Sequence, residues 1–376
     1  MQTQSYLYEN NEWDTSLDSS LDSKNTLIIC FGSTNFDEIQ NGFDDICSTF
    51  KNSQIMGCST AGEIHDDLVY DSSLSVIVMK FEKTNLKTIS IACDNVEESL
   101  NVGADISSKL NEDGLKSIFV LSEGLNINGS QLTKGFNKTI SSDVVVTGGL
   151  AGDGTDFAKT WVLVDNKPVS NYVTAVGFYG DNVEVSYAAG GGWKKFGIDR
   201  MVTQANNNIL YKLDNEPALT VYKKYLGEKS AQLPASGLLY PLMIKEEGSN
   251  ESKVRTILAV NEQEQSITFA GDIPNGSEVM FMKASFEELV DGAKVAGDKL
   301  INSYKDQDAA CLAVSCVGRK LVLGQKIDEE LEVVKEQFGD NTQLVGYYSY
   351  GEISPLNDGT CDLHNQTMTL TLIWES

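Results

Sequence analysis

Three short stretches of this sequence contain the residue types that a ligand-binding loop needs. They are GCSTAGEIH (57–65), GGLAGDG (148–154) and GYYSYGEIS (346–354). Glycine has no side chain, so the backbone can come close to a bound group and point its N–H donors at it. The acidic residue that follows the glycine can accept a hydrogen bond from an amine or a hydroxyl group. All three stretches are therefore candidate binding loops.

The acidic residues of these loops are Glu63, Asp153 and Glu352. Each could contact a ligand, or could instead accept from nearby backbone N–H groups and hold its own turn. Glu352 is the best candidate for ligand binding, because Arg319 in SCVGR is expected at the same edge of the fold. A guanidinium and a carboxylate at one edge would bind the two ends of a zwitterion. The alternative is an Arg–Glu ion pair that stabilises the loops.

The residues next to Arg319 and Glu352 complete the predicted site, with Tyr348 and Tyr350 as possible walls of a pocket. The full set of predicted ligand-binding residues is Arg319, Glu352, Ser349, Tyr348, Cys316, Asn365, Gly351, Glu63, Ser59 and Asp153.

Three further residues could carry chemistry. Cys316 could be a nucleophile, since a thiolate beside Arg319 would have a lowered pKa, but it could also be a small core residue. His65 and His364 could each be a haem ligand or a general base, although neither lies in a metal-binding sequence pattern. We expect no cofactor and no enzymatic activity. Haem binding and a Cys316-dependent enzyme are the alternatives.

The loops end similar runs of predicted elements. Residues 25–81 are predicted to form strand, helix, strand, acidic loop and strand, and the same order recurs in residues 116–165 and 309–374. A strand, a helix and a strand within some thirty residues form a parallel βαβ unit. The sequence therefore predicts a mixed α/β (α+β) fold, with repeated strand–helix–strand units in stacked mixed sheets and helices outside. The loops would lie at the sheet edge where ligands bind in such folds.

Composition restricts the classes of partner. The chain has 376 residues, a formal charge of -25 and 41% hydrophobic residues, so neither nucleic acid nor an anionic membrane is an expected partner. Residues 1–24 are polar and acidic and are predicted to be a tail or a weakly held helix. The sequence has no signal peptide, no apolar run of about 20 residues and no paired-cysteine pattern, which predicts a cytoplasmic protein.

Six strings in this order resemble the FIST sensory domain: GCSTAGEI, VTGGLAGDG, EPALTVYKKYLG, SCVGR, YYSYGEISP and HNQT. The likeness covers residues 25–376. It implies a FIST N-like domain over residues 25–205 and a FIST C-like domain over residues 206–376. It also implies a bacterial signal-input domain that binds small ligands such as amino acids.

The resemblance implies partners as well, because such domains are often attached to histidine kinase, chemotaxis or cyclic-dinucleotide modules. The sequence contains no such module. It therefore predicts a stand-alone cytoplasmic sensor of an amino-acid-like metabolite that signals through a separate partner. A related subset is associated with haem, so the alternative is a haem-binding nitric oxide sensor that uses His65 or His364.

Overall fold

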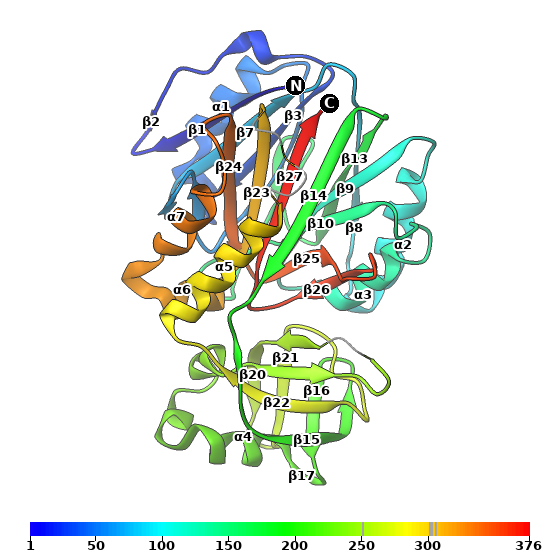
Figure 1. The fold of residues 1–376 in the computed structure, drawn as a ribbon, viewed down its shortest axis with the longest axis vertical. Helices are drawn as coiled ribbons and strands as arrows, with labels where there is room; N and C mark the ends of the chain where they lie inside the picture. The colour runs from blue at the N-terminus through cyan, green and yellow to red at the C-terminus, as the bar shows by residue number, and fades with distance from the viewer. Residues whose placement is uncertain (250–251, 301–303, 305–306) are drawn as a thin grey trace.

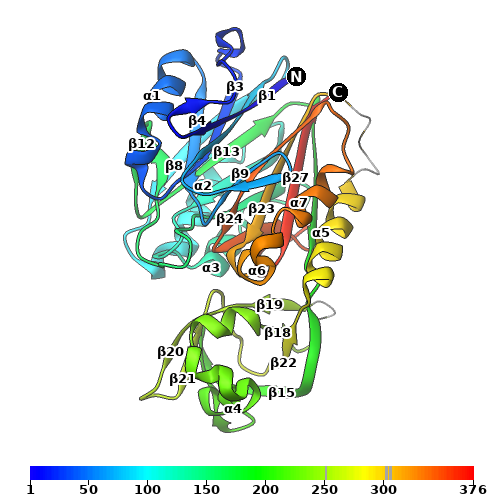
Figure 2. The same ribbon diagram turned by 90° about the vertical axis from the view of Figure 1, so that its left-hand side faces the viewer.

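A computed structural model describes residues 1–249, 252–300, 304 and 307–376. It confirms the mixed α/β class, with four sheets and helices on their outer faces (Figure 1). Three of the sheets form a large body that contains both termini. The fourth sheet forms a smaller domain below it (Figures 1 and 2).

The three predicted repeats are present, and each has a parallel strand pair at its centre. Parallel neighbours need a crossover connection, and in each repeat helices supply it. The first repeat is β3 (Thr26–Gly32), α1 (Gln40–Thr49) and β4 (Gln54–Ser59), and the second is β9 (Leu115–Ser122), α3 (Gly129–Phe136) and β10 (Val145–Leu150). The third repeat is β23 (Ala309–Cys316), α6 (Val317–Leu323), α7 (Glu329–Lys335) and β24 (Thr342–Ser349).

The strand after each acidic loop leaves its own repeat and joins the sheet of another one. β5 (Glu63–His65) of the first repeat pairs with β24 of the third. β25 (Gly351–Pro355) of the third repeat pairs with β10 of the second. β11 (Val162–Val164) of the second repeat pairs with β4 of the first. The exchange is cyclic, so the three repeats hold one another together.

This exchange brings the three acidic loops to one junction. The backbone N–H of Ala61 donates to the carbonyl oxygen of Tyr348 at 2.8 Å. The backbone N–H of Gly152 donates to the carbonyl oxygen of Ser59 at 3.1 Å. The N–H of Tyr350 donates to the carbonyl oxygen of Leu150 at 3.3 Å. Each acidic loop is therefore hydrogen-bonded to another one. The three copies of the loop together form the junction, one from each repeat.

The remaining elements of the large body extend and cover its sheets. The core between the sheets contains aromatic and aliphatic side chains from all three repeats, including Phe31, Phe119 and Tyr347. The added strands are β1 (Gln2–Glu9), β2 (Glu12–Trp13), β6 (Leu68–Tyr70), β7 (Leu74–Lys80), β8 (Asn85–Ala92), β12 (Lys167–Val169), β13 (Tyr172–Tyr179), β14 (Val183–Gly190), β26 (Cys361–His364) and β27 (Met368–Glu375). The added helices are α2 (Ser99–Leu110) and α5 (Phe286–Leu300).

The N-terminus differs from the prediction of a polar tail. β1 pairs with β7 over seven residue pairs, and its side chains Tyr6, Leu7 and Tyr8 are buried. The hydroxyl of Ser5 donates to the side-chain oxygen of Gln343 at 2.8 Å. β1 is therefore held by pairing within its own sheet and by a side-chain contact with β24 of a neighbouring sheet, which composition alone does not reveal.

The smaller domain is inserted between β14 and α5. The predicted border between residues 205 and 206 falls inside its first strand. Its core contains Leu210, Tyr222, Leu242 and Phe281. Its elements are β15 (Lys194–Asn206), β16 (Ile209–Leu213), β17 (Glu216–Pro217), α4 (Ala218–Leu226), β18 (Leu242–Lys245), β19 (Lys253–Arg255), β20 (Ile257–Asn261), β21 (Ser266–Phe269) and β22 (Glu278–Lys283), with short 3-10 turns over Gly227–Gln232 and Ala235–Leu239.

Candidate functional site

Two of the three acidic loops hold their carboxylates in the same way. Glu63 accepts from the hydroxyl of Thr60 and from the N–H and hydroxyl of Ser73, at 3.1 and 2.9 Å for the Ser73 donors. Glu352 accepts from the hydroxyl of Ser349 at 2.9 Å and from the N–H and hydroxyl of Thr367 at 3.1 and 2.8 Å. Both side chains are almost fully buried. In the structure both carboxylates therefore hold their own turns, which was the alternative to direct ligand contact.

Asp153 of the middle loop has different partners. It accepts from the backbone N–H groups of Phe157, Ala158 and Lys159 at 2.9, 2.7 and 2.7 Å. It also accepts from the hydroxyl of Tyr350, which belongs to the third loop. Asp153 thus fixes the turn that carries Phe157 and ties two of the loops together.

Burial changes the ionisation of the two glutamates. Desolvation raises the pKa of Glu63 to about 7 and that of Glu352 to about 8, against an ordinary value of 4.5. The hydrogen bonds that they accept oppose this shift without cancelling it. Glu352 is therefore largely protonated near neutral pH.

This ionisation gives a testable pH dependence. Folded Glu352 binds its proton more tightly than the unfolded chain does, so its contribution to stability is complete below pH 4.5 and is lost as the pH rises through about 8. Glu352→Gln cannot titrate. We expect the unfolding free energy of the wild type to fall relative to this variant between pH 5 and pH 9, by up to about 1.4 kcal/mol per pH unit. Urea unfolding at several pH values measures the difference.

The exposed Glu97 supplies the control for this experiment. A Glu97→Gln variant is expected to keep a nearly constant difference from the wild type over the same range. A constant difference for Glu352→Gln as well would contradict the raised pKa.

Arg319 does not have the predicted partner. Its side chain is fully buried, and Nε and Nη2 donate to Glu330 of α7 at 3.0 and 2.7 Å. Nη1 donates to the carbonyl oxygen of Gly191, and Nη2 also donates to the carbonyl oxygen of Leu289 at 2.8 Å. The guanidinium therefore makes four hydrogen bonds within the protein, and the Arg319–Glu352 arrangement for a zwitterion is replaced by an Arg319–Glu330 ion pair.

Cys316 also differs from the prediction. It is 2% exposed, and desolvation raises the pKa of its thiol, an effect that the nearby Arg319 only partly offsets. The thiol therefore stays protonated, and the structure does not prepare it as a nucleophile.

The other predicted binding residues lie at or near the loop junction. Tyr348 donates from its hydroxyl to Glu330 at 2.6 Å, and Ser59 accepts from the N–H of Trp161 at 3.0 Å. Gly351 begins β25, and the amide of Asn365 donates to the carbonyl oxygen of His364 at 2.9 Å. The structure brings most of the predicted residues together, but in the interior of the protein.

The two histidines do not fit a haem group. His65 lines a cavity of about 480 Å³ whose other residues include Asp66, Asp67 and Lys335, so the apolar macrocycle would meet charged groups. His364 donates from Nε2 to the carbonyl oxygen of Ser354 at 3.0 Å, which occupies that ring nitrogen. Across the described ranges, no group of three or more His, Cys, Asp or Glu side chains is placed to hold a metal ion.

A cavity of about 520 Å³ lies between the large body and the smaller domain, and the sequence analysis did not identify it. We call it the interdomain cavity. Its lining residues from the large body are Thr155, Phe157 and Leu321, and those from the smaller domain are Gln232, Leu233, Pro234, Ser236, Leu238, Leu239, Ile257 and Leu258.

The interdomain cavity adjoins the loop junction. Phe157 stacks on Tyr350 with ring centroids 4.5 Å apart, so the middle and third loops together support one wall. Leu238 accepts through its carbonyl oxygen from the side-chain amide of Gln366 at 3.0 Å. Gln366 is fully buried, adopts a φ of 63° and leaves its Oε1 without a hydrogen bond. The sequence signal for this site was the apolar LPASGLLYP stretch (233–241), which looks like an ordinary core segment.

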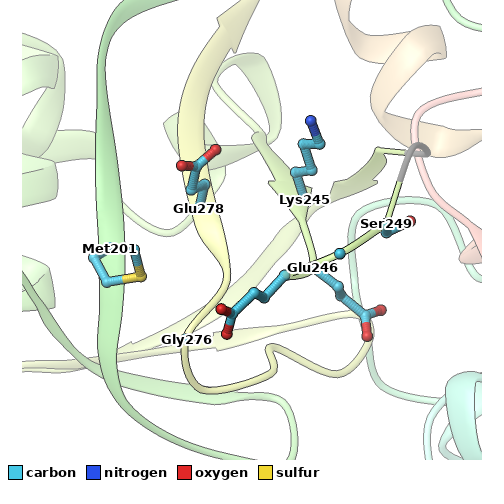
Figure 3. Close-up of a pocket in the computed structure, with 8 residues that line it drawn as sticks. Met201, Lys245, Glu246, Ser249, Gly276 and Glu278 are labelled. Atoms are coloured by element: carbon cyan, nitrogen blue, oxygen red, sulfur yellow. The ribbon is translucent and has the colours of Figure 1, made fainter.

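A second cavity of about 520 Å³ lies on the smaller domain (Figure 3). Met201, Lys245, Glu246 and Glu278 surround it, and Figure 3 shows them on neighbouring strands and the adjoining loop. None of its lining residues is buried. It is therefore a shallow acidic surface with no enclosed wall.

The structure thus defines a mixed α/β repeat protein with a cavity between its two domains. Residues 26–216 match the FIST N domain and residues 218–355 match the FIST C domain, so the chain belongs to the FIST family. FIST domains are sensory signal-transduction domains. The part of the chain that the structure describes contains no helix long and apolar enough to cross a bilayer.

The individual proteins that are similar to this chain include one relative and one solved structure. The protein MJ1623 of Methanocaldococcus jannaschii, which is described as uncharacterized, is 22% identical over 364 residues that cover 84% of this chain and 67% of that protein. The crystal structure of a cyanuric acid hydrolase from A. caulinodans covers 78% of this chain and 99% of its own, at 11% identity. Its TM-score of 0.18 is too low to carry an argument.

Proposed function

We propose that this chain is a sensory protein that binds a small molecule in the interdomain cavity and signals through a separate partner. The observation that carries the proposal is that both domains contribute residues to the walls of this cavity. Small-ligand sites occur preferentially at domain interfaces and have volumes of about 300–1,000 Å³. A molecule bound there contacts both domains, so its occupancy can change how they sit against each other.

Polar contacts away from the lining of the interdomain cavity also connect the two domains. Asp272 of the smaller domain accepts from Asn128, Gln131 and Lys134 near α3, at 3.1, 2.5 and 2.8 Å. Lys253 pairs with Asp362 at 2.5 Å. These are polar contacts rather than a continuous apolar core, which suits an interface that rearranges when a ligand binds.

The class of partner follows from the family. We propose a histidine kinase, a chemotaxis protein or a cyclic-dinucleotide signalling protein as the receiver of the signal. The net charge of -25 disfavours nucleic acid as a partner. An amino-acid-like ligand was predicted from Arg319 and Glu352, and amino acids therefore belong in the first ligand panel.

A thermal-shift screen tests the proposal. We expect at least one member of a broad metabolite panel that includes amino acids to stabilise the protein, by about 2.7 kcal/mol at one hundred times its dissociation constant. In a Leu258→Arg variant the long charged side chain enters the cavity, so the same compound should no longer stabilise the protein. Native mass spectrometry of freshly isolated protein would identify a co-purified ligand.

The exposed Val96, which is 46% accessible, gives the matched control. Val96→Arg adds the same charge away from the cavity and is expected to keep the full ligand response. A panel without any stabiliser, or stabilisation that survives Leu258→Arg, would count against the interdomain cavity as the sensory site.

A further inference from the structure

The lining of the interdomain cavity carries no charge. Of the eleven residues that line it, eight are apolar and the polar ones are Thr155, Gln232 and Ser236. This is unusual for a chain in which 54 residues are acidic and 29 are basic. A charged ligand group that lost its water here would find no counter-charge on the wall.

Two cations of α6, the helix that carries Leu321, are already paired. Arg319 is held by Glu330. Lys320 pairs with Asp71 at 2.5 Å and also donates to the carbonyl oxygen of Ala61 at 2.9 Å. These cations have partners on the protein, so a ligand carboxylate would have to compete with existing bonds.

The aromatic wall of the cavity is held in place at an energetic cost. Phe157 has a φ of 49°, in the left-handed region that bulky residues rarely adopt. Asp153 stabilises this conformation by accepting from the N–H of Phe157 at 2.9 Å, and the ring stacks on Tyr350 with an interplanar angle of 15°. A strained residue that is held by several contacts is typical of binding sites. The fold therefore presents a flat aromatic face to the cavity.

The polar side chains that line the cavity are uncharged, so they can contact a ligand only through neutral hydrogen bonds. The hydroxyl of Ser236 already donates to the carbonyl oxygen of Lys229 at 2.9 Å, which leaves its lone pairs as acceptors. Gln232 is exposed at the rim. The amide of Gln366 lies behind Leu238, with its Oε1 unpaired. The Ser236 lone pairs and the Gln232 amide, which belong to lining residues, can orient a ligand through one or two neutral hydrogen bonds.

We propose that the interdomain cavity selects an uncharged, largely apolar small molecule with a flat ring, and that it rejects zwitterions with the same ring. This inference rests on the proposed function and specifies its ligand class. The ring would lie against Phe157, with its edge between Leu238 and Leu258. A neutral donor on the ligand would reach the acceptors at the polar rim.

Titration with 1-aminoanthracene, a neutral fluorescent aromatic, tests this class directly. We expect saturable fluorescence enhancement with the wild type and with Val96→Arg, and at least a tenfold weaker response with Leu258→Arg. Indole and L-tryptophan then compete for the bound dye. They share one ring system and differ in the zwitterionic group, so indole should displace the dye at a concentration at least tenfold lower.

The outcomes separate this inference from the proposed function. Displacement by L-tryptophan at the same or a lower concentration than indole, lost in Leu258→Arg, would overturn the ligand class while it supports ligand binding in the cavity. Absence of dye binding to the wild type, or equal binding to Leu258→Arg, would also overturn the inference. The metabolite panel described above would then decide the proposed function independently. Circular dichroism of both arginine variants confirms that they are folded.

Discussion

Replacing Arg319 by alanine is expected to destabilise the protein by about 3–5 kcal/mol, because it breaks a fully buried ion pair from one side. Glu330 would keep only two hydroxyl donors, Tyr348 at 2.6 Å and Ser315 at 3.2 Å. The carbonyl oxygens of Gly191 and Leu289 would lose their guanidinium donors in the same step. Urea unfolding of the wild type and the variant measures the change.

Two further variants make this result specific. Lys223→Ala removes an ion pair with Glu262 whose two side chains are 33% and 60% exposed, and it should change stability by no more than about 1 kcal/mol. Arg319→Met combined with Glu330→Gln leaves no unpaired charge, and it should be more stable than Arg319→Met alone. If Arg319→Ala left the unfolding free energy nearly unchanged and abolished ligand binding instead, the ligand-binding role that the sequence predicted for Arg319 would be restored.

The repeats could be predicted from sequence because local geometry requires particular residues at the same places. A glycine and an acidic residue mark each loop, and Glu63 and Glu352 have equivalent partners in Thr60 and Ser349. Such requirements act over a few residues, so they appear as sequence patterns. The parallel pairing of each repeat followed from the length of its crossover connection.

The cyclic exchange of strands could not be predicted in this way. β5 and β11 have only three residues each, which is too short for a periodic signal. Their partners are chosen by the packing of whole sheets. Because the sequence does not reveal this strand exchange, it could not show that the three acidic loops meet at one junction in the interior.

The interdomain cavity was not predicted for a related reason. The sequence analysis expected Arg319 at the edge that carries the acidic loops, but an arginine side chain is long, and Glu330 on α7 lay within its reach. The interdomain cavity combines Phe157, Leu258 and Leu321 from three separated segments. Single apolar residues of this kind look like core residues in a sequence, and only the inserted position of the smaller domain makes them face one cavity.

Substitution of Gly346 by alanine is expected to cost about 3 kcal/mol or more, or to prevent folding, because there is no space for a methyl group. A Cβ atom at this position would lie 1.8 Å from the carbonyl oxygen of Ala313, its partner in the parallel pair. The equivalent glycines of the other repeats, Gly57 and Gly148, would place a Cβ atom 2.4 and 1.9 Å from the carbonyl oxygens of their own partners. Backbone atoms cannot move aside without separating the strands.

Gly191→Ala is the matched control, since the nearest atom to a Cβ at Gly191 would be 3.8 Å away. It should change stability by less than about 0.5 kcal/mol. Urea unfolding compares the two variants, and hydrogen exchange of β23 and β24 shows whether the damage is local to the strand pair. If Gly346→Ala had the same unfolding free energy as the wild type, β23 and β24 could not approach as closely at this residue as the structure shows. The acidic loop that follows β24 would then not need this glycine to enter the junction.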